Sequence, residues 1–207
     1  SEMVDGLVGS EMCIRDSHGA TVLSIAALPF DHQPTRKKIA QAEIKRLEHH
    51  SDVCVQLSLD RLARQARDRG KDWSMGSEWV EDLIDGLVRT LLSMGLINLD
   101  LMDLRAIVQH KGASTMLVGT GHHDQLEGLY NATIKAPLAP MNVAGAKGCL
   151  LQIEGGMGMT IGQVDEIATA LTSAGDSEAQ VILGARVSPD LEGTIRIVML
   201  LSGIGED

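Results

Sequence analysis

The sequence contains few aromatic residues: Phe, Trp and Tyr together make up 2% of its 207 residues. Its core must therefore be built from aliphatic side chains and from the 10 Met residues. It has three Cys, at positions 13, 54 and 149, whose spacing matches neither a metal site nor a disulfide framework. A reducing compartment is the simplest interpretation. No run of about 18 apolar residues is present, which argues against direct insertion into a membrane.

Positive charge is also scarce, with 18 Lys and Arg residues against 28 Asp and Glu residues and a net charge of −10. Excess negative charge repels phosphate backbones, so we predict no nucleic-acid partner. Apolar residues make up 44% of the chain and charged residues 22%. This balance is typical of a globular protein rather than of a disordered one.

The first residues look foreign to the rest of the chain. Residues 6–17 resemble the translation of a transposon adaptor that is used to prepare DNA sequencing libraries. The alternative is a natural N-terminal segment, but not a secretory signal, because acidic residues interrupt it and it has no apolar centre. We therefore expect residues 1–17 to be non-native, the natural protein to be present from about His18, and further sequence to be missing upstream.

Strand-like and helix-like segments alternate along the rest of the chain. Short β-branched and aliphatic runs predict strands at 21–28, 52–57, 115–119, 149–153, 181–187 and 194–201. Periodic apolar positions and helix-ending Gly or Pro predict helices at 35–48, 79–91, 101–109, 124–135 and 160–174. The helix at 35–48 is highly charged, with apolar positions at Ile39, Ala42 and Leu47. The alternation predicts an α/β or α+β fold.

The most specific motif is Gly-Leu-Ile-Asn-Leu-Asp-Leu-Met-Asp-Leu at 95–104, between two predicted helices. Three more follow the same order as in one known family: Ala-Leu-Pro-Phe at 27–30, the Gly-rich stretch 145–156, and Gly-Ala-Arg-Val-Ser-Pro-Asp at 184–190. Together they resemble the FtsZ family, the tubulin-like GTPases that polymerise at the division site, and especially its archaeal members.

The resemblance implies an α/β fold class: the C-terminal part of a tubulin/FtsZ-like GTPase domain, a long central helix, and a smaller α+β C-terminal activation domain. Residues 18–111 would be the rear part of the nucleotide-binding domain, with the central helix and the acidic synergy loop. Residues 112–207 would be the activation domain, and 1–17 the non-native segment.

The resemblance assigns Asn98, Asp100 and Asp103 to the acidic loop that one subunit inserts toward the γ-phosphate held by the next. Carboxylates suit this role because they can orient or deprotonate the attacking water. Asp100 and Asp103 also have the spacing of a helix N-cap and a first-turn acid. Capping alone and catalysis therefore both remain open, and the two roles are compatible.

The nucleotide contacts implied by the resemblance are Gln33 and Lys37 for the ribose and phosphate, and Trp73 and Ser77 for the base. The family's Gly-rich phosphate loop should precede the first strand and is absent from this sequence. Its base-contacting Asn falls on Leu59, which cannot read a guanine edge. GTP and Mg²⁺ are therefore implied by the resemblance, while this chain by itself is expected to bind GTP poorly.

Two functions follow. The first is an FtsZ-like cytoskeletal GTPase that polymerises head to tail and hydrolyses GTP at subunit junctions during cell division, this chain being a fragment of it. The alternative is a non-catalytic paralogue that binds and modulates filaments. Either would self-associate or join filaments in the cytoplasm at the mid-cell division ring. Membrane-tether proteins would bind a C-terminal tail beyond the sequence.

His122, His123 and Asp124 are the residue types that bind metal ions. Adjacent His side chains normally diverge, and no second pair lies at ligand spacing. We therefore predict an exposed turn at 122–124 and assign no metal ligand.

Overall fold

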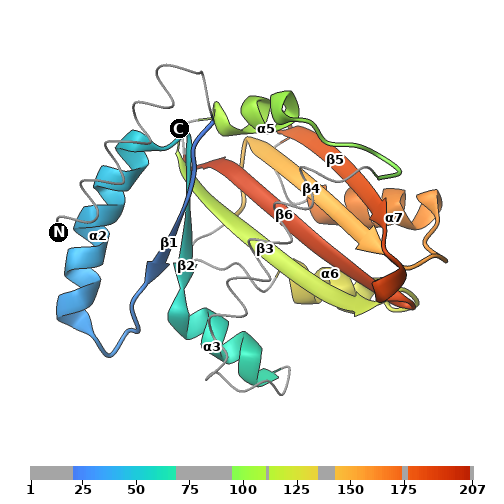
Figure 1. The fold of residues 1–207 in the computed structure, drawn as a ribbon, viewed down its shortest axis with the longest axis horizontal. Helices are drawn as coiled ribbons and strands as arrows, with labels where there is room; N and C mark the ends of the chain where they lie inside the picture. Colours follow the sequence, from blue (N-terminus) through green and yellow to red (C-terminus); the bar gives the residue numbers. More distant parts are fainter. Residues whose placement is uncertain (1–20, 69–94, 111, 135–142, 174–176, 206–207) are drawn as a thin grey trace.

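The computed structural model describes residues 21–68, 95–110, 112–134, 143–173 and 177–205 (Figure 1). Its strands are β1 Leu23–Leu28, β2 Val53–Ser58, β3 Ala113–His122, β4 Gly148–Gly155, β5 Gln180–Val187 and β6 Thr194–Ile204. Its helices are α2 Pro34–His50, α3 Leu59–Asp68, α5 Leu101–Val108, α6 Leu126–Ile134, α7 Ile161–Thr172 and the 3₁₀ turn η2 Pro189–Leu191. The helix predicted at 79–91 lies outside the described residues. No described helix is both long and apolar enough to cross a membrane.

The strands form a mixed sheet in the order β1-β2-β3-β6-β4-β5. β6 runs antiparallel to both β3 and β4, whereas β1 with β2, and β4 with β5, pair in parallel. A single residue pair, Val55 with Ser114, connects β2 to β3. Figure 1 accordingly shows β1 and β2 as a section set at an angle to the other four strands. The predicted α/β class is confirmed.

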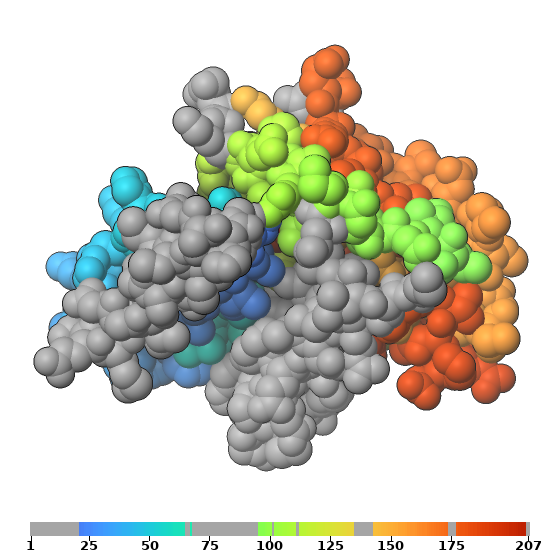
Figure 2. All heavy atoms as spheres, turned by 45° about the horizontal axis from the view of Figure 1, so that its top comes forward, coloured from blue at the N-terminus to red at the C-terminus, as the bar shows by residue number. Residues whose placement is uncertain are grey.

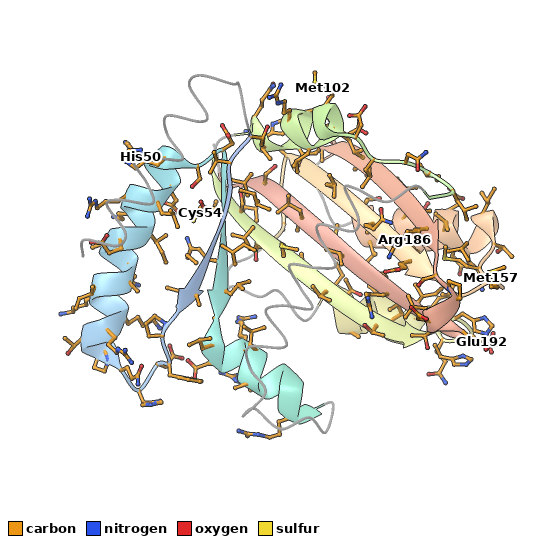
Figure 3. The ribbon with its side chains drawn as sticks, viewed as in Figure 1. His50, Cys54, Met102, Met157, Arg186 and Glu192 are labelled. Carbon is orange, nitrogen blue, oxygen red and sulfur yellow. The ribbon has the colours of Figure 1, made fainter. Side chains whose placement is uncertain are left out.

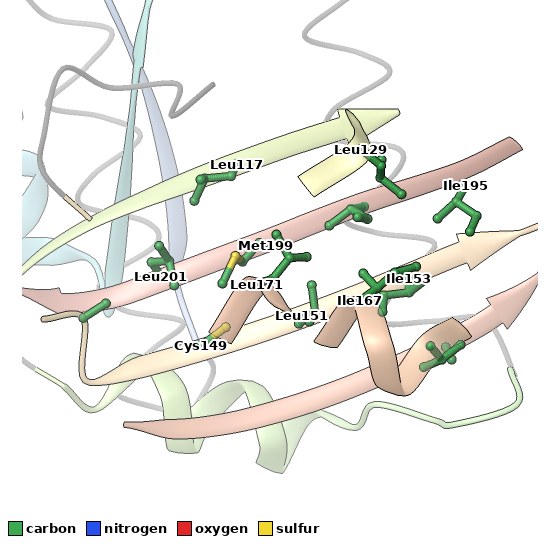
Figure 4. Close-up of a cluster of buried hydrophobic side chains, with 14 of the residues drawn as sticks. Leu117, Leu129, Cys149, Leu151, Ile153, Ile167, Leu171, Ile195, Met199 and Leu201 are labelled. Carbon is green, nitrogen blue, oxygen red and sulfur yellow. The ribbon is translucent and has the colours of Figure 1, made fainter. Parts of the chain in front are cut away.

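Both faces of the four-stranded section are covered. Ile197, Met199 and Leu201 of β6 belong to the core cluster beneath α6 and α7 (Figure 4). Val198 and Leu200, which alternate with them, belong to the cluster on the opposite face. Because side chains alternate along a strand, a strand covered on both sides must be apolar at nearly every position. This explains the apolar run at 197–201 within β6.

α5 closes the second face and connects the two sections of the sheet. Its Leu104 and Ile107 are buried in one cluster with Val55 and Leu57 of β2. The guanidinium Nε of Arg105 donates a hydrogen bond of 3.0 Å to the hydroxyl of Thr21, just before β1. The last turn of α5 is therefore held near the amino end of β1.

The first strand and helix are less buried than the sequence predicted. β1 lies at the end of the described strand order, and Leu28 is its one fully buried residue. α2 packs through Ile44, while Ile39, an expected apolar contact, is 60% exposed. In a helix with this many charged residues the apolar spacing is too sparse to define one face.

Candidate functional site

The motif at 95–104 forms a loop that is hydrogen-bonded to β5 and then enters α5. The backbone N–H groups of Ile97 and Ala185 each donate to the other residue's carbonyl, both at 3.0 Å. A Cβ atom at Gly95 would collide with the carbonyl oxygen of Ala185, so the close approach requires glycine. The side-chain oxygen of Asn98 accepts a 2.6 Å hydrogen bond from the Gly95 N–H and closes the loop.

Leu99 anchors the loop in the core. It is buried beside Gly184, where an added Cβ would lie 2.7 Å from the Leu99 Cγ. Its neighbours Asn98 and Asp100 are exposed. The buried leucine therefore determines which side chains of the loop reach solvent.

Asp100 and Asp103 form a reciprocal capping box at the start of α5. Oδ1 of Asp100 accepts hydrogen bonds from the N–H groups of Met102 at 2.7 Å and Asp103 at 2.9 Å. Oδ2 of Asp103 accepts from the Asp100 N–H at 2.9 Å. Within the described part of the chain, neither carboxylate uses its other oxygen in a hydrogen bond. Both acids therefore cap α5, and each keeps one carboxylate oxygen for another contact.

Exposed apolar side chains surround these acids. Leu96, Ile97 and Met102 are large, apolar and exposed, Met102 by 65%. Figure 3 shows Met102 on the outer side of α5, and Figure 2 shows α5 at the molecular surface. Apolar residues next to charged ones on an exposed surface are typical of a protein–protein contact.

A second candidate region is a cleft of about 170 Å³ at the carboxyl ends of β1 and β2. Ligands of open α/β sheets bind at this end of the strands. The residues that line it are mostly polar: Leu28, Pro29, Asp31, Lys37, Ser58, Asp60, Arg61 and Arg64.

Two opposite charges of this cleft, Lys37 and Asp31, are already paired with each other. The ammonium group of Lys37 donates a hydrogen bond to Asp31 and holds the pKa of that carboxyl below its ordinary value. The N–H of Asp31 in turn donates to Asp60 at 2.7 Å. A phosphate would therefore have to displace Asp31 from Lys37. The cleft fits a polyphosphate only after that exchange.

Of the other predicted nucleotide contacts, some lie within the described residues and some lie outside them. Gln33 precedes α2, makes no side-chain cap, and is half-buried near the cleft residue Lys37, whose N–H donates to its carbonyl at 3.0 Å. Leu59 packs against the core cluster shared by α5 and β2. Trp73 and Ser77 lie outside the described residues. The structure thus brings Gln33 and Lys37 together and leaves the base contacts undescribed.

The acidic loop and the cleft lie at opposite ends of β1. α5 is bound to Thr21 before the strand, whereas Pro29 and Asp31 of the cleft follow it. A strand of six residues spans about 20 Å. Figure 1 shows the same arrangement, with α5 at one end of the β1–β2 section and α3 at the other.

The expectation that the adjacent side chains of His122 and His123 diverge is wrong. The rings of His122 and His123 do not diverge, because their centroids lie 4.7 Å apart. His122 is the last residue of β3, and His123 begins the turn that follows. The alternation that would point neighbouring side chains of a strand to opposite faces therefore ends between His122 and His123.

The C-terminal part of the chain matches a known family. The model for the FtsZ family, C-terminal domain, matches residues 112–205. Cell division protein FtsZ 2 of Methanocaldococcus jannaschii is 27% identical over 197 residues, covering 92% of this chain and 52% of that protein. Cell division protein FtsZ of Caulobacter vibrioides is 30% identical over 198 residues, covering 93% of this chain and 39% of that protein. The chain spans about half the length, or less, of these relatives.

Solved structures share the fold. A structure described as an empty FtsZ dimer of M. jannaschii superposes with a TM-score of 0.83 at 24% identity, covering 94% of this chain and 58% of that chain. CetZ2 of Haloferax volcanii, described as a GTPγS-bound protofilament, superposes with a TM-score of 0.74 at 16% identity, covering 99% of this chain and 62% of that chain.

Proposed function

We propose that this chain, whose residues 112–205 match the model for the FtsZ family, C-terminal domain, is part of a cell-division GTPase that polymerises head to tail. In this proposal residues 18–111 are the rear of the nucleotide domain and 112–207 the activation domain. The chain supplies its acidic loop to GTP that is held by the next subunit. The protein would act in the cytoplasm at the division ring.

The observation that carries the proposal is the placement of the two candidate regions at opposite ends of β1. Head-to-tail stacking brings the loop end of one subunit onto the cleft end of the next. The exposed Leu96, Ile97 and Met102 supply an apolar rim for that contact. The two relatives whose structures are described as a dimer and a protofilament support assembly of this kind.

The loop has groups suited to hydrolysis. The second oxygens of Asp100 and Asp103 are available to orient a water molecule or to accept its proton. The Asn98 side-chain oxygen holds the loop, so its amide NH₂ is the group that donates outward. The helix N-terminus beneath the acids offsets part of their charge.

The test is to add the 207-residue chain to the FtsZ of C. vibrioides, kept below its assembly concentration with GTP and Mg²⁺. The chain alone should show no turnover, because Lys37, its candidate phosphate contact, is paired with Asp31. In the mixture phosphate release should rise with added chain and saturate. A turnover rate that stays at the level of the relative alone would overturn the proposal.

A second function is favoured by two observations: Leu59 packs against the core, and Lys37 is paired with Asp31. A paralogue that binds filaments without catalysing hydrolysis would need neither a base contact nor a phosphate contact. A second mixture, in which the C. vibrioides FtsZ is above its assembly concentration, separates the two functions by the sign of the effect. A catalytic loop raises turnover, whereas a non-catalytic cap lowers the turnover of an assembling partner.

A further inference from the structure

We propose that His122, His123 and Asp124 form a binding site for a divalent transition metal, with Zn²⁺ as the representative ion. One ligand atom from each residue lies within 4.8 Å of the other two. Nδ1 of His122 is 3.5 Å from one carboxylate oxygen of Asp124, and Nδ1 of His123 is 3.1 Å from the other. The site shares no residue with the acidic loop or the cleft.

These distances suit a common metal centre. Ligand atoms that lie about 2.0–2.2 Å from a tetrahedral Zn²⁺ are about 3.3 Å from one another. Both His–Asp distances fall close to this value. The three ligand atoms lie within 4.8 Å of one another, so they would have to move closer together to share one ion.

The backbone holds the three residues in place. The N–H of His123 donates to the carbonyl of Gly193 at 3.1 Å, and that of Gln125 donates to the carbonyl of His122 at 3.0 Å. Gly193 has φ +70°, and a Cβ there would lie 3.4 Å from His122 Nε2. Both imidazoles therefore lie over a residue without a side chain, on a turn fixed to β6.

The donor set selects the class of ion. Two imidazoles and one carboxylate favour Zn²⁺, Ni²⁺ or Cu²⁺ over Mg²⁺ and Ca²⁺, which prefer all-oxygen ligands. The N–H of Asp124 donates to Nδ1 of His122 at 3.3 Å, so an ion bound by this nitrogen would replace that hydrogen bond. The side chains are 54%, 37% and 69% exposed, which lets an ion enter and leaves a coordination position open.

The chain contains a matched control. His49 and His50 are also adjacent, also precede an Asp by a short spacing, and end α2. Among the residues that the structure describes, only the group at 122–124 brings three potential ligands together. Residue types alone would predict equal Zn²⁺ binding at 49–52 and at 122–124. The geometry predicts Zn²⁺ binding at 122–124 only.

The test is isothermal titration of Zn²⁺ into the 207-residue chain, with Cys13→Ser in every sample to remove a competing thiol. We expect one Zn²⁺ per chain. His123→Ala and Asp124→Asn should each weaken binding at least about tenfold, and the His49→Ala/His50→Ala variant should bind as the parent does. Co²⁺ in place of Zn²⁺ should give tetrahedral absorption bands without a thiolate charge-transfer band.

Circular dichroism of each variant checks that its fold is retained, as expected for exposed side chains. Absence of Zn²⁺ uptake by the parent chain would overturn the proposal. Equal binding by the parent, His123→Ala and Asp124→Asn would overturn it too. Loss of binding in the His49→Ala/His50→Ala variant alone would place the ion at α2 and contradict the assignment.

Discussion

α5 and α7 begin with the same hydrogen-bonding device but with different chemistry. At α7 the hydroxyl of Thr160 accepts from the Gln163 N–H at 3.2 Å, and the Gln163 side chain accepts from the Thr160 N–H at 3.0 Å. At α5 two carboxylates make the equivalent bonds. The neutral box of α7 shows that capping needs an acceptor and not a charge.

The acids of α5 add negative charge to a cap that α7 makes without charge. Two carboxylates three residues apart repel each other, and the helix N-terminus offsets only part of that cost. The box at α5 also follows a loop that is bound to β5 through Ile97 and surrounded by exposed apolar side chains. Charge in excess of the capping requirement, placed on such a surface, points to a contact with another molecule.

The largest effect on stability is expected at Gly95, which positions the charged box. Gly95→Ala would push the loop away from the carbonyl of Ala185, at a cost of about 1–3 kcal/mol. Gly158→Ala is the control, because an added Cβ there meets nothing within 4 Å. Urea unfolding measures both. Equal midpoints for the two variants would show that the loop is not held as described.

Removing either cap should cost the same. Asp100→Ala and Thr160→Ala each remove the side chain that accepts the N-terminal N–H bonds, and each should cost about 1 kcal/mol. Asp100→Asn should change the free energy of unfolding by only a few tenths of a kcal/mol, because Asn caps as well as Asp. A cost for Asp100→Asn as large as that for Asp100→Ala would mean that the charge itself stabilises α5.

The smallest expected effect is a change in the alkylation rate of Cys149, which distinguishes loss of the α7 cap from loss of the α5 cap. Cys149 lies in the cluster beneath α7 with Leu171 (Figure 4), and burial raises the pKa of its thiol to about 12. Loss of the Thr160 cap should therefore increase alkylation of Cys149 through opening of α7 as a unit, because Leu171 lies at the far end of the helix from Thr160. Asp100→Ala should leave it unchanged.

Mass spectrometry after iodoacetamide treatment at pH 8 reads the modification of each thiol. Cys54 serves as an internal reference, since burial, with a smaller effect of Glu48, raises its pKa to about 11. It packs with Ile44 of α2 and not with α7. Faster alkylation of Cys54 in Thr160→Ala would show that the cap acts on the whole fold.

The regular elements could be predicted because their signals are local. Period-two and period-3.6 patterns lie within about ten residues, and the N-caps Asp100 and Thr160 stand directly before their helices. The buried face of α2 could not be predicted, because its few apolar residues are outnumbered by charged ones. Ile39, one of the three apolar positions expected of this helix, is exposed.

The geometry of the sites depends on contacts that are distant in sequence. The loop at 95–100 is held by Ala185, and no pattern near the motif indicates that partner. The requirement for glycine at Gly95 and Gly184 was the available signal. The pairing of Lys37 with Asp31 was missed because the resemblance assigned Lys37 to a phosphate. The convergence of His122 and His123 depends on where β3 ends, and strand ends are poorly marked in sequence.

The most direct test replaces the capping box of α5 with that of α7. Asp100→Thr with Asp103→Gln gives α5 the neutral box of α7, so the double variant should retain the stability of the parent to within about 1 kcal/mol. Added to C. vibrioides FtsZ with GTP, it should lose the stimulation of phosphate release by about 100-fold or more, the scale of a lost general base. Stimulation equal to that of the parent chain would show that the acids are caps alone and contradict the proposed catalytic loop.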